Sequence, residues 1–409
     1  MRRVTYNLGL AAFVGMLSVG LLSLTLGAYC QVSPPGAHAR EHDNGALPSV
    51  VLKEAPLIQM PGVPVPERKL LHAVDSNSPV HWDGDRVYMF NSYNHPYRVM
   101  GADIADLGMP APVQFEGDGT DNRLFMWIEA TWRDADGTLY GAYHYEPDTI
   151  CFANTHIPTA PKIGWIKSTD NGANWQDLGF VVEANPARID CNSASPWDAG
   201  GTGDMTFLPD RDDKYFYIYG TSYDPAFEEQ GIFVARLPFA DRDHASGKAQ
   251  KWYRGNWTEP GLWGHVTPVF PAMKDYTHAD GEMFWGPSIH WNTYLEEYVM
   301  VLNHAVDTRL KGGGIYISFN RDLGNPGGWS EPIMILDQNQ VKKLTQGGSA
   351  QPNALENGWY PEIIGTEKGQ SDRLCGRVGR LFVAGMSRLE ITFVRPNEKH
   401  STSASGPQN

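Results

Sequence analysis

Charged residues and cysteines are scarce in this sequence. Only 20% of its 409 residues are charged and 41% are hydrophobic, which excludes wholesale disorder and allows a large core. The formal net charge is −14 and no basic stripe is present, so a nucleic-acid groove is excluded and the acidity is most simply a source of solubility. No Cys/His zinc spacing, Ser/His/Asp order, nucleotide-binding glycine loop or Walker pattern stands out, so we predict no metal and no cofactor.

Long apolar runs are absent except near the start of the chain. Arg2 and Arg3 precede an apolar run from Leu8 to about Ala28, as in a targeting segment. Three alternatives follow: cleavage after Ala39, lipidation of Cys30, or a retained membrane anchor. Each places the rest of the chain outside the cytoplasm. We therefore predict a secreted, periplasmic or cell-surface protein that meets a membrane only through an N-terminal anchor or lipid.

The remaining cysteines allow one disulfide in an exported protein. Cys30 leaves with the signal or carries lipid, so Cys151, Cys191 and Cys375 remain. Cys151 and Cys191 flank one strand-turn-strand unit in two loops, and we favour that pair. The alternative is three buried free thiols.

Glycine, proline and aromatic residues are plentiful and favour many short strands with tight turns. The chain has 43 Gly, 29 Pro, 18 Tyr, 16 Phe and 13 Trp. Five units repeat a short apolar strand, an acidic or glycine turn, and a strand rich in aromatic and β-branched residues. The units cover residues 78–92, 127–175, 203–236, 285–329 and 360–385.

The spacing of these units predicts an all-β fold, a five-bladed β-propeller. At roughly 55–80 residues it is too long and irregular for WD40 repeats, whereas one four-stranded sheet per unit, arranged radially, gives a propeller. Interlocking of the first and last units would close the ring. A two-sheet sandwich is the alternative. The predicted organisation is signal peptide and linker in 1–39, linker and leading strand in 40–66, propeller in 67–396, and disordered tail in 397–409.

The segment from Ser168 to Trp175 reads S-x-D-x-G-x-x-W. It resembles the Asp-box of sialidases and related β-propellers. In such a turn the Asp side chain accepts backbone N–H bonds, Gly permits the tight backbone, and Trp packs between sheets. We therefore assign it a structural role. A degenerate copy lies between Ser318 and Trp329.

Acidic residues begin three of the strands predicted to line the central channel. Glu129 interrupts an apolar aromatic strand, Asp204 follows four residues rich in glycine, and Glu362 follows Trp359-Tyr360-Pro361. Glycoside hydrolysis needs two carboxyl groups across one sugar bond, one protonated and one ionised. We predict Glu129 and Asp204 as the acid/base or nucleophile pair and Glu362 as a pKa modulator or sugar ligand. The alternative is buried ion pairs with Arg98, Arg123 or Arg236.

Further polar and aromatic residues near these strand starts are candidates for binding a sugar. Asp75 also precedes the first inner strand. A histidine in an aromatic strand is more often packed and hydrogen-bonded than a ligand, and no spacing supports a channel cation. The predicted substrate-binding residues are Asn77, His144, Glu146, Trp285, His290, Trp359 and Tyr360.

The units together resemble the five-bladed β-propeller glycosidase superfamily of arabinanases, β-xylosidases, levanases and invertases, over about residues 70–395. Trp285-Gly286-Pro287-Ser288 is similar to the Glu-Gly-Pro strand start that carries that superfamily's general acid, with Trp285 in the acid's place and Glu282 the nearest acid. Ser78-Pro79 resembles the Asp-Pro that carries the base, with Ser in place of Asp. Both positions depart from the pattern, so the acids have moved to other blades or the protein is not a hydrolase.

The leading hypothesis is an exported glycoside hydrolase-like propeller that cleaves a poly- or oligosaccharide with paired carboxylates. One alternative is a non-catalytic, lectin-like carbohydrate-binding propeller, and a second is a sialidase-like exo-glycosidase. All three name carbohydrate as the partner. Geometry separates them, because a hydrolase needs carboxyl groups that face each other at roughly 5–10 Å.

Overall fold

The computed structural model describes residues 46–66, 69–116, 125–147, 151 and 158–398. The predicted signal peptide and linker in 1–39 and residues 399–409 of the predicted tail lie outside this range. Within the described part of the chain, no helix is long and apolar enough to cross a membrane.

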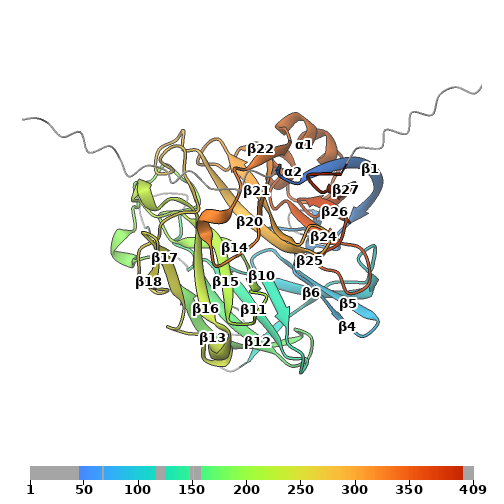
Figure 1. Ribbon diagram of the computed structural model, residues 1–409, viewed down its shortest axis with the longest axis horizontal. Coiled ribbons are helices and arrows are strands. Elements are labelled where there is room, and N and C mark those ends of the chain that lie inside the picture. The colour runs from blue at the N-terminus through green and yellow to red at the C-terminus, as the bar shows by residue number, and fades with distance from the viewer. Residues whose placement is uncertain (1–45, 67–68, 117–124, 148–150, 152–157, 399–409) are drawn as a thin grey trace, which may run out of the picture. The chain divides into compact units, whose positions relative to one another are not determined.

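Five of the six sheets of the described chain each begin with a strand on the channel side (Figure 1), and the sixth has only two strands. Each inner strand contacts the next: β4 touches β10, β10 touches β14, β14 touches β20 and β20 touches β24. This order is a five-bladed β-propeller and confirms the predicted fold class. The inner strands are β4 (Val80–Asp83), β10 (Met126–Arg133), β14 (Thr202–Pro209), β20 (Met283–Asn292) and β24 (Glu362–Gly365).

The outer strands follow in chain order within each blade, with a few additions at the edges. Blade 1 continues with β5 (Arg86–Ser92), β6 (Pro96–Asp103), β7 (Asp106–Leu107) and β8 (Ala111–Pro112). Blade 2 adds β11 (Leu139–Tyr145), β12 (Lys162–Ser168), β13 (Asn174–Val182) and the parallel strand β9 (Gln114–Glu116). Blade 3 adds β15 (Tyr215–Ser222), β16 (Gly231–Pro238), β17 (Gln250–Tyr253), β18 (Asn256–Pro260) and β19 (Phe270–Pro271).

Blades 4 and 5 are joined by a short parallel strand. Blade 4 adds β21 (Glu297–Ala305), β22 (Gly312–Asn320), β23 (Ile333–Leu336) and β25 (Leu374–Cys375), which comes from the chain of blade 5. Blade 5 adds β26 (Val378–Val383), β27 (Met386–Val394) and β1 (Ser49–Gln59). A separate pair is formed by β2 (Val63–Val65) and β3 (Leu70–Ala73). The helices are α1 (Gln338–Thr345) and α2 (Pro352–Asn357), with 3₁₀ turns η2 (Pro186–Arg188), η3 (Phe227–Glu229), η4 (Phe239–His244) and η5 (Pro326–Gly328).

The N-terminal strand closes the ring. β1 runs antiparallel to β27, from Ser49 opposite Val394 to Gln59 opposite Met386, so the two ends of the propeller share blade 5. Figure 1 shows this pairing as the blue strand beside the red one. The first strand of the described chain, β1, is therefore the outer strand of the last blade. This pairing closes the ring between the two ends of the propeller.

A hydrophobic core fills each of the five interfaces between neighbouring blades. Trp165 of blade 2 packs on Phe207 of blade 3 with ring centroids 4.6 Å apart. Tyr219 of blade 3 meets Trp329 of blade 4 edge-on at 5.7 Å. Because strands in a propeller bury both faces, aromatic and β-branched side chains appear on both sides of each sheet, and this removes the strict alternation of a half-exposed sheet.

The S-x-D-x-G-x-x-W segment forms the tight turn between β12 and β13. The Asp170 carboxylate accepts the backbone N–H of Ala173 at 3.0 Å and that of Asn174 at 2.9 Å. Trp175 is fully buried and packs edge-on against Phe90 of blade 1 at 5.6 Å. These contacts fix the turn to the neighbouring blade, in keeping with the structural role assigned to it.

Glu362 and Asp372 join the last blade to the first beside the channel. The backbone N–H of Ser78 donates to Glu362 at 3.0 Å and that of Val80 donates to Asp372 at 2.8 Å. Burial raises the pKa of Glu362 well above its usual range, and the nearby charge of Asp372 raises it further, although the Ser78 N–H opposes this. Burial therefore favours the neutral form of Glu362, which acts as an acceptor between two blades.

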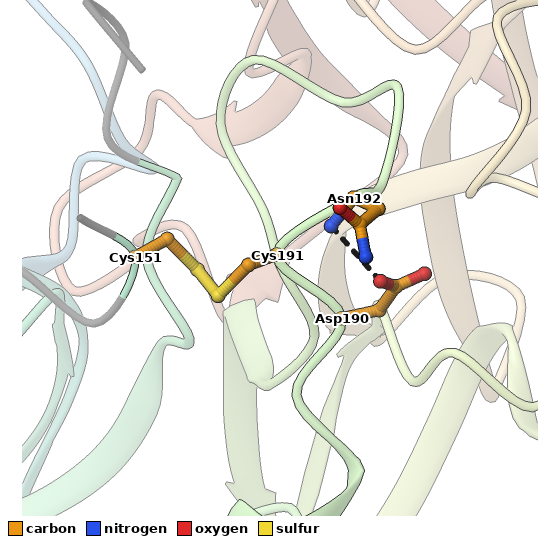
Figure 2. The surroundings of a disulfide bond; sticks show 4 residues. All are labelled: Cys151, Asp190, Cys191 and Asn192. Atoms are coloured by element: carbon orange, nitrogen blue, oxygen red, sulfur yellow. Dashed lines mark hydrogen bonds between the residues drawn. A yellow bond between two sulfur atoms is a disulfide. The ribbon is translucent and has the colours of Figure 1, made fainter. Parts of the chain in front are cut away.

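The loops after β11 and after η2 are held together by the disulfide Cys151–Cys191, which confirms the predicted pair. Figure 2 shows this bond beside the turn in which the Asn192 backbone N–H donates to Asp190 at 2.9 Å. Cys375 is buried and carries a free thiol. The disulfide therefore restrains the long loop that leads into β14.

Replacing Glu362 with Ala should destabilise the fold more than replacing it with Gln. The amide of Glu362→Gln still accepts the Ser78 N–H, whereas Glu362→Ala leaves that buried donor unpaired, at a cost of about 1–3 kcal/mol. Urea unfolding measures the free energy of each variant, and we expect less than about 1 kcal/mol for the Gln variant. Equal losses for the two variants would contradict the role as a neutral acceptor.

The double variant Cys151→Ala/Cys191→Ala should unfold more easily than the wild type. The bond closes a loop with a sequence separation of 40 residues, and loop-closure entropy gives about 3–4 kcal/mol for such a loop. Thermal unfolding with and without reductant tests this. Reductant should lower the stability of the wild type and leave the double variant unchanged. The expectation would be refuted if, without reductant, the wild type and the double variant were equally stable.

Candidate active site

A cavity of about 510 Å³ opens where the inner strands begin. Its walls come from β10 and β14, the segment before β4, the loop before β14, and the segments on either side of α2. Five carboxyl groups line it, and no lysine or arginine does so among the described residues. The carboxyl groups belong to Asp75, Glu129, Glu146, Asp198 and Asp204.

Local irregularities in two inner strands aim the central acids into this cavity. The register of β10 on β11 shifts between Ile128 and Ala130, so Glu129 is the extra residue of a β-bulge. The register of β14 on β15 shifts between Gly203 and Thr206, and Asp204 there has φ of 40°. A bulge turns a side chain away from the regular alternation, and here it brings an acid from each strand to the same mouth.

The glycine before Asp204 is required by a close approach. A Cβ added at Gly203 would lie 2.5 Å from the ring of His144, closer than real carbon contacts allow. The Asp204 backbone N–H donates to Nδ1 of that ring at 3.0 Å. The glycine therefore permits the contact that places Asp204 beside His144.

Glu129, His144 and Asp204 form a compact cluster. Nδ1 of His144 lies 3.8 Å from a Glu129 oxygen and 4.0 Å from an Asp204 oxygen, and one ligand atom from each residue lies within 4.8 Å of the other two. Glu129 and Asp204 are only 2% and 7% exposed. Ionising both carboxyl groups so close together in a low-dielectric site costs much free energy, so the pKa values of the two groups must differ.

The hydrogen bonds distinguish the two acids. Oε2 of Glu129 accepts the Met205 backbone N–H at 2.5 Å, while Asp204 accepts the hydroxyl of Tyr223 and, at 3.3 Å, that of Tyr360. Burial raises the pKa of both tyrosines well above 10, so both hydroxyls stay protonated and donate. Two donors favour the ionised form of Asp204.

Burial and the charge of Asp204 raise the pKa of Glu129 to about 8. Burial also raises the pKa of Asp204, but His144 and the Tyr223 hydroxyl oppose that rise. The arrangement therefore favours the proton on Glu129 and the charge on Asp204, which is the division of roles that general acid catalysis with a second carboxylate needs.

His144 links the two acids. Burial alone would lower its pKa, but the hydrogen bond with Glu146 and the charges of Asp204 and Glu129 raise it to about 10. A second proton on the ring would sit on Nδ1 and break the bond from the Asp204 N–H. A protonated Glu129 no longer supplies the charge that helps to raise the pKa of His144, so the two groups titrate as a coupled pair.

The same three side chains offer one nitrogen and two carboxylate oxygens to a cation. The lone pair of Nδ1, however, already accepts the Asp204 N–H at 3.0 Å. A cation bound there would have to displace this hydrogen bond. We therefore interpret the cluster as a site of proton chemistry.

The structure brings together some predicted binding residues and separates others. His144, Glu146, Trp359 and Tyr360 line the cavity with Glu129 and Asp204. The described lining does not include Asn77, Trp285, His290 or Glu362.

The residues outside the lining have other contacts. Trp285 is buried behind the lining and meets Trp359 and Tyr360 edge-on, at 5.9 and 5.4 Å. Asn77 donates to the Pro287 carbonyl at 3.0 Å. His290 packs against Phe393, and burial lowers its pKa to about 3.

The alternative of ion pairs between these acids and arginine is not found for Arg98 or Arg236. Arg98 donates to the Asp170 carbonyl at 2.9 Å, and Arg236 donates to the side chain of Gln250. Arg123 lies outside the described residues. Backbone N–H groups, tyrosine hydroxyls and His144 serve the buried acids in place of arginine.

The predicted site did not include two acids that line the cavity. Asp75 accepts an N–H from Gln351, and burial raises its pKa to about 7. Asp198 accepts the Tyr276 hydroxyl at 3.4 Å, and burial raises its pKa well above the usual range. The position of Asp75 before an inner strand was a usable signal. Asp198 lies in an irregular loop, where no periodic pattern marks it.

No protein-family model and no curated protein matches this chain. Among solved structures it is similar to an exo-β-1,3-galactanase from Phanerochaete chrysosporium with β-1,3-galactotriose, at 11% identity and a TM-score of 0.42 over 84% of this chain. The chain spans 63% of that galactanase's length. An α-L-arabinanase from Cellvibrio cellulosa with arabinohexaose matches at 13% identity and TM-score 0.45, over 78% of this chain and 91% of the arabinanase. A thermostable family-43 glycoside hydrolase matches at 11% identity and a TM-score of 0.45, over 78% of this chain and 88% of the hydrolase.

Activity that depends on a protonated Glu129 should fall as the pH rises through about 8. The raised pKa means that Glu129 keeps its proton well above the ordinary carboxyl range, so the acid form is present below about pH 8 and lost above it. A pH profile of kcat/KM measures this limb. Asp75→Asn should keep this limb and move it to slightly lower pH, because the charge of Asp75 is a minor cause of the raised pKa of Glu129. An alkaline limb near pH 4–5 would contradict the assignment of Glu129.

Proposed function

We propose that this chain is an exported glycoside hydrolase-like propeller that cleaves a poly- or oligosaccharide. The observation that carries the proposal is the close pairing of the buried carboxyl groups of Glu129 and Asp204 around His144, in a cavity at the channel mouth. The bulges in β10 and β14 support it, because they direct both acids into the same cavity.

Glu129 is the general acid in this proposal. Its Oε2 accepts the Met205 N–H, so the proton resides on Oε1, which is free to protonate the glycosidic oxygen of the leaving group. The ionised Asp204 either stabilises the positive charge that develops at the anomeric carbon or attacks that carbon as nucleophile. The two groups offer oxygens within 4.8 Å, nearer to the ~5–5.5 Å of retaining enzymes than to the ~6.5–9.5 Å of inverting ones. This favours Asp204 as nucleophile, with a glycosyl ester that water then hydrolyses while Glu129 acts as base.

The aromatic lining suits a sugar ring. Trp127, Trp197 and Trp359 line the cavity together with Tyr93 and Phe125. Trp197 is 39% exposed and meets Trp359 edge-on at 6.4 Å, so part of its surface is open to a ligand. Flat aromatic faces pack on the C–H faces of sugars while carboxylates accept their hydroxyls.

The charge of the cavity narrows the substrate to neutral sugars. Five carboxyl groups line it without a lysine or arginine among the described residues, so a substrate carboxylate would be repelled. A sialoside carries such a carboxylate and needs cations around it. The sialidase-like alternative therefore fits this cavity less well than hydrolysis of a neutral glycan.

A second candidate is a non-catalytic carbohydrate-binding propeller. It is favoured by the low exposure of Glu129 and Asp204 and by the hydrogen bonds that hold them, which also suit a rigid floor beneath a binding cavity. The proposal of export rests on the positively charged and apolar N-terminal segment and on the disulfide, which persists in oxidising compartments.

Hydrolysis assays with purified variants test the catalytic assignment. The panel contains β-1,3-galactotriose, arabinohexaose, other neutral furanosides and pyranosides, and a sialoside. Glu129→Gln and Asp204→Asn should each lower kcat at least ~100-fold on the best substrate, the scale of a lost general acid or nucleophile. Glu54→Gln on the exposed face of β1 and Asp136→Asn in the β10–β11 turn are matched controls that should retain activity.

Full activity in both Glu129→Gln and Asp204→Asn would overturn the hydrolase proposal. A wild-type protein that binds a neutral glycan but hydrolyses none of the panel would select the lectin-like candidate. NMR of the first product separates the two mechanisms, because the proposed nucleophile predicts retention of anomeric configuration.

A further inference from the structure

A second cavity, of about 420 Å³, lies at the opposite ends of the inner strands. β10 and β14 contribute to both cavities: Glu129 and Asp204 near their starts line the first, and Arg133 and Pro209 at their ends line the second. Four residues of strand separate Glu129 from Arg133, about 13 Å at the usual rise. We call this second cavity the basic mouth.

The charge of the basic mouth is the reverse of that of the first cavity. Arg133, Arg211 and Arg373 line it, together with Asp210 and Asp213. The Asp210 carboxylate is engaged with the Lys214 backbone N–H in its turn. Three guanidinium groups in one cavity are unexpected in a chain of net charge −14.

Arg373 is held in place by its backbone, and its guanidinium lies over the Phe207 ring at 5.8 Å while two of its nitrogens lack an acceptor. Its backbone carbonyl accepts the Trp291 N–H at 2.9 Å and its own N–H donates to Ser371 Oγ at 3.1 Å. Nε and Nη1 are buried and have no hydrogen-bond acceptor among the described residues. The adjacent carboxylate of Asp372 accepts the Val80 N–H, on the side of blade 1. Buried guanidinium N–H groups without acceptors are costly unless a ligand supplies one.

The neighbouring side chains add surface for a ring. Trp82 and Trp132 are half-buried and line the cavity, and Trp82 is fixed by the bond from its Nε1 to the Gln370 carbonyl at 2.7 Å. Arg211 is exposed and lies over the Trp291 ring at 4.5 Å. His81 is 4% exposed, and its Nδ1 has no partner among the described atoms. This nitrogen can therefore accept a hydrogen bond from a sugar hydroxyl.

We propose that the basic mouth binds an acidic saccharide, whose carboxylate or sulfate meets the guanidinium of Arg373 and whose ring packs on Trp82 and Trp132. Arginine matches both anions because its planar fork gives two parallel charge-assisted hydrogen bonds. Arg211 supplies a second cation at the rim. This site is separate from the proposed hydrolytic centre and does not require Glu129 or Asp204 to be catalytic.

Titration calorimetry of the folded full chain at low salt tests the proposal. Four probes are used: trigalacturonate as carboxylate, a sulfated carrageenan tetrasaccharide, neutral β-1,3-galactotriose, and inorganic sulfate. One or both acidic saccharides should bind the wild type, and Arg373→Met should weaken that binding at least 10-fold. Arg388→Met is the matched control, because Arg388 is a half-buried arginine of β27 outside the described lining of both cavities, and it should bind as the wild type does.

A second variant guards against misfolding of Arg373→Met. Arg211→Met changes an exposed side chain, so the fold should be kept, and it should weaken binding of the same saccharide at least 3-fold with an unchanged circular dichroism spectrum. Glu129→Gln should bind the acidic saccharide as the wild type does even though hydrolysis at the other mouth is lost. The failure of one proposal is thereby distinguished from the failure of the other.

Three outcomes overturn the proposal. The first is that neither acidic saccharide binds the wild type, or that both bind Arg373→Met and Arg211→Met as tightly as they bind the wild type. The second is that only inorganic sulfate binds, which is an adventitious ion only. The third is that ADP, added as a competing anion with an aromatic base, binds more tightly than either saccharide, which assigns the cavity to a nucleotide.

Discussion

The antiparallel pairing of β1 with β27 is the contact on which the rest of the structure depends. An open arc of five sheets would leave two bare edges and let the blades move apart, whereas this pairing fixes the first blade against the last. Glu362 and Asp372 complete the seam beside the channel by accepting N–H bonds from Ser78 and Val80. Within the ring β10 and β14 are neighbours, which lets Glu129 accept a hydrogen bond from Met205 and lets the Asp204 N–H donate to His144.

Within that ring, β-bulges in β10 and β14 place the acids of the candidate site at the channel mouth. Regular alternation along β10 and β14 would bury each acid between blades or leave it paired along the strand, and a bulge at each position turns it to the mouth instead. Burial then raises the pKa of both carboxyls, and the different hydrogen bonds to Glu129 and Asp204 separate them. The cost of burying two acids is offset in part by donors from several elements: the Met205 N–H of β14 for Glu129, and the Tyr223 and Tyr360 hydroxyls for Asp204.

The sequence predicts the fold and part of this site, and the limits have physical causes. Repeated strand units, turn residues and the Ser168–Trp175 segment suffice for the propeller, and an acid within an apolar strand suffices to single out Glu129. Glu362 has the same sequence signature, yet β24 pairs with β26 in regular register, and its carboxyl contacts Ser78 instead of lining the cavity. Whether an inner strand bulges depends on its pairing with the next strand, which single-sequence patterns do not show. Asp198 lies in a loop positioned by distant contacts, which local patterns miss for the same reason.

The two mouths show how one set of strands can present opposite charges. The starts of β10 and β14 carry Glu129 and Asp204, and the other ends of the inner strands meet Arg133, Arg211 and Arg373. Over about 13 Å of strand and a Debye length of about 8 Å, the solvent-exposed charges of one mouth are largely screened from the other. Each mouth can therefore select a ligand by its own charge, although the whole chain is acidic. Of the three arginines, only Arg133 has a carboxylate within salt-bridge distance among the described residues, that of Asp83 at 2.9 Å. The Phe207 ring and the neighbouring Asp372 accompany the Arg373 guanidinium, but neither provides an acceptor for Nε and Nη1, which is what the proposed anion would do.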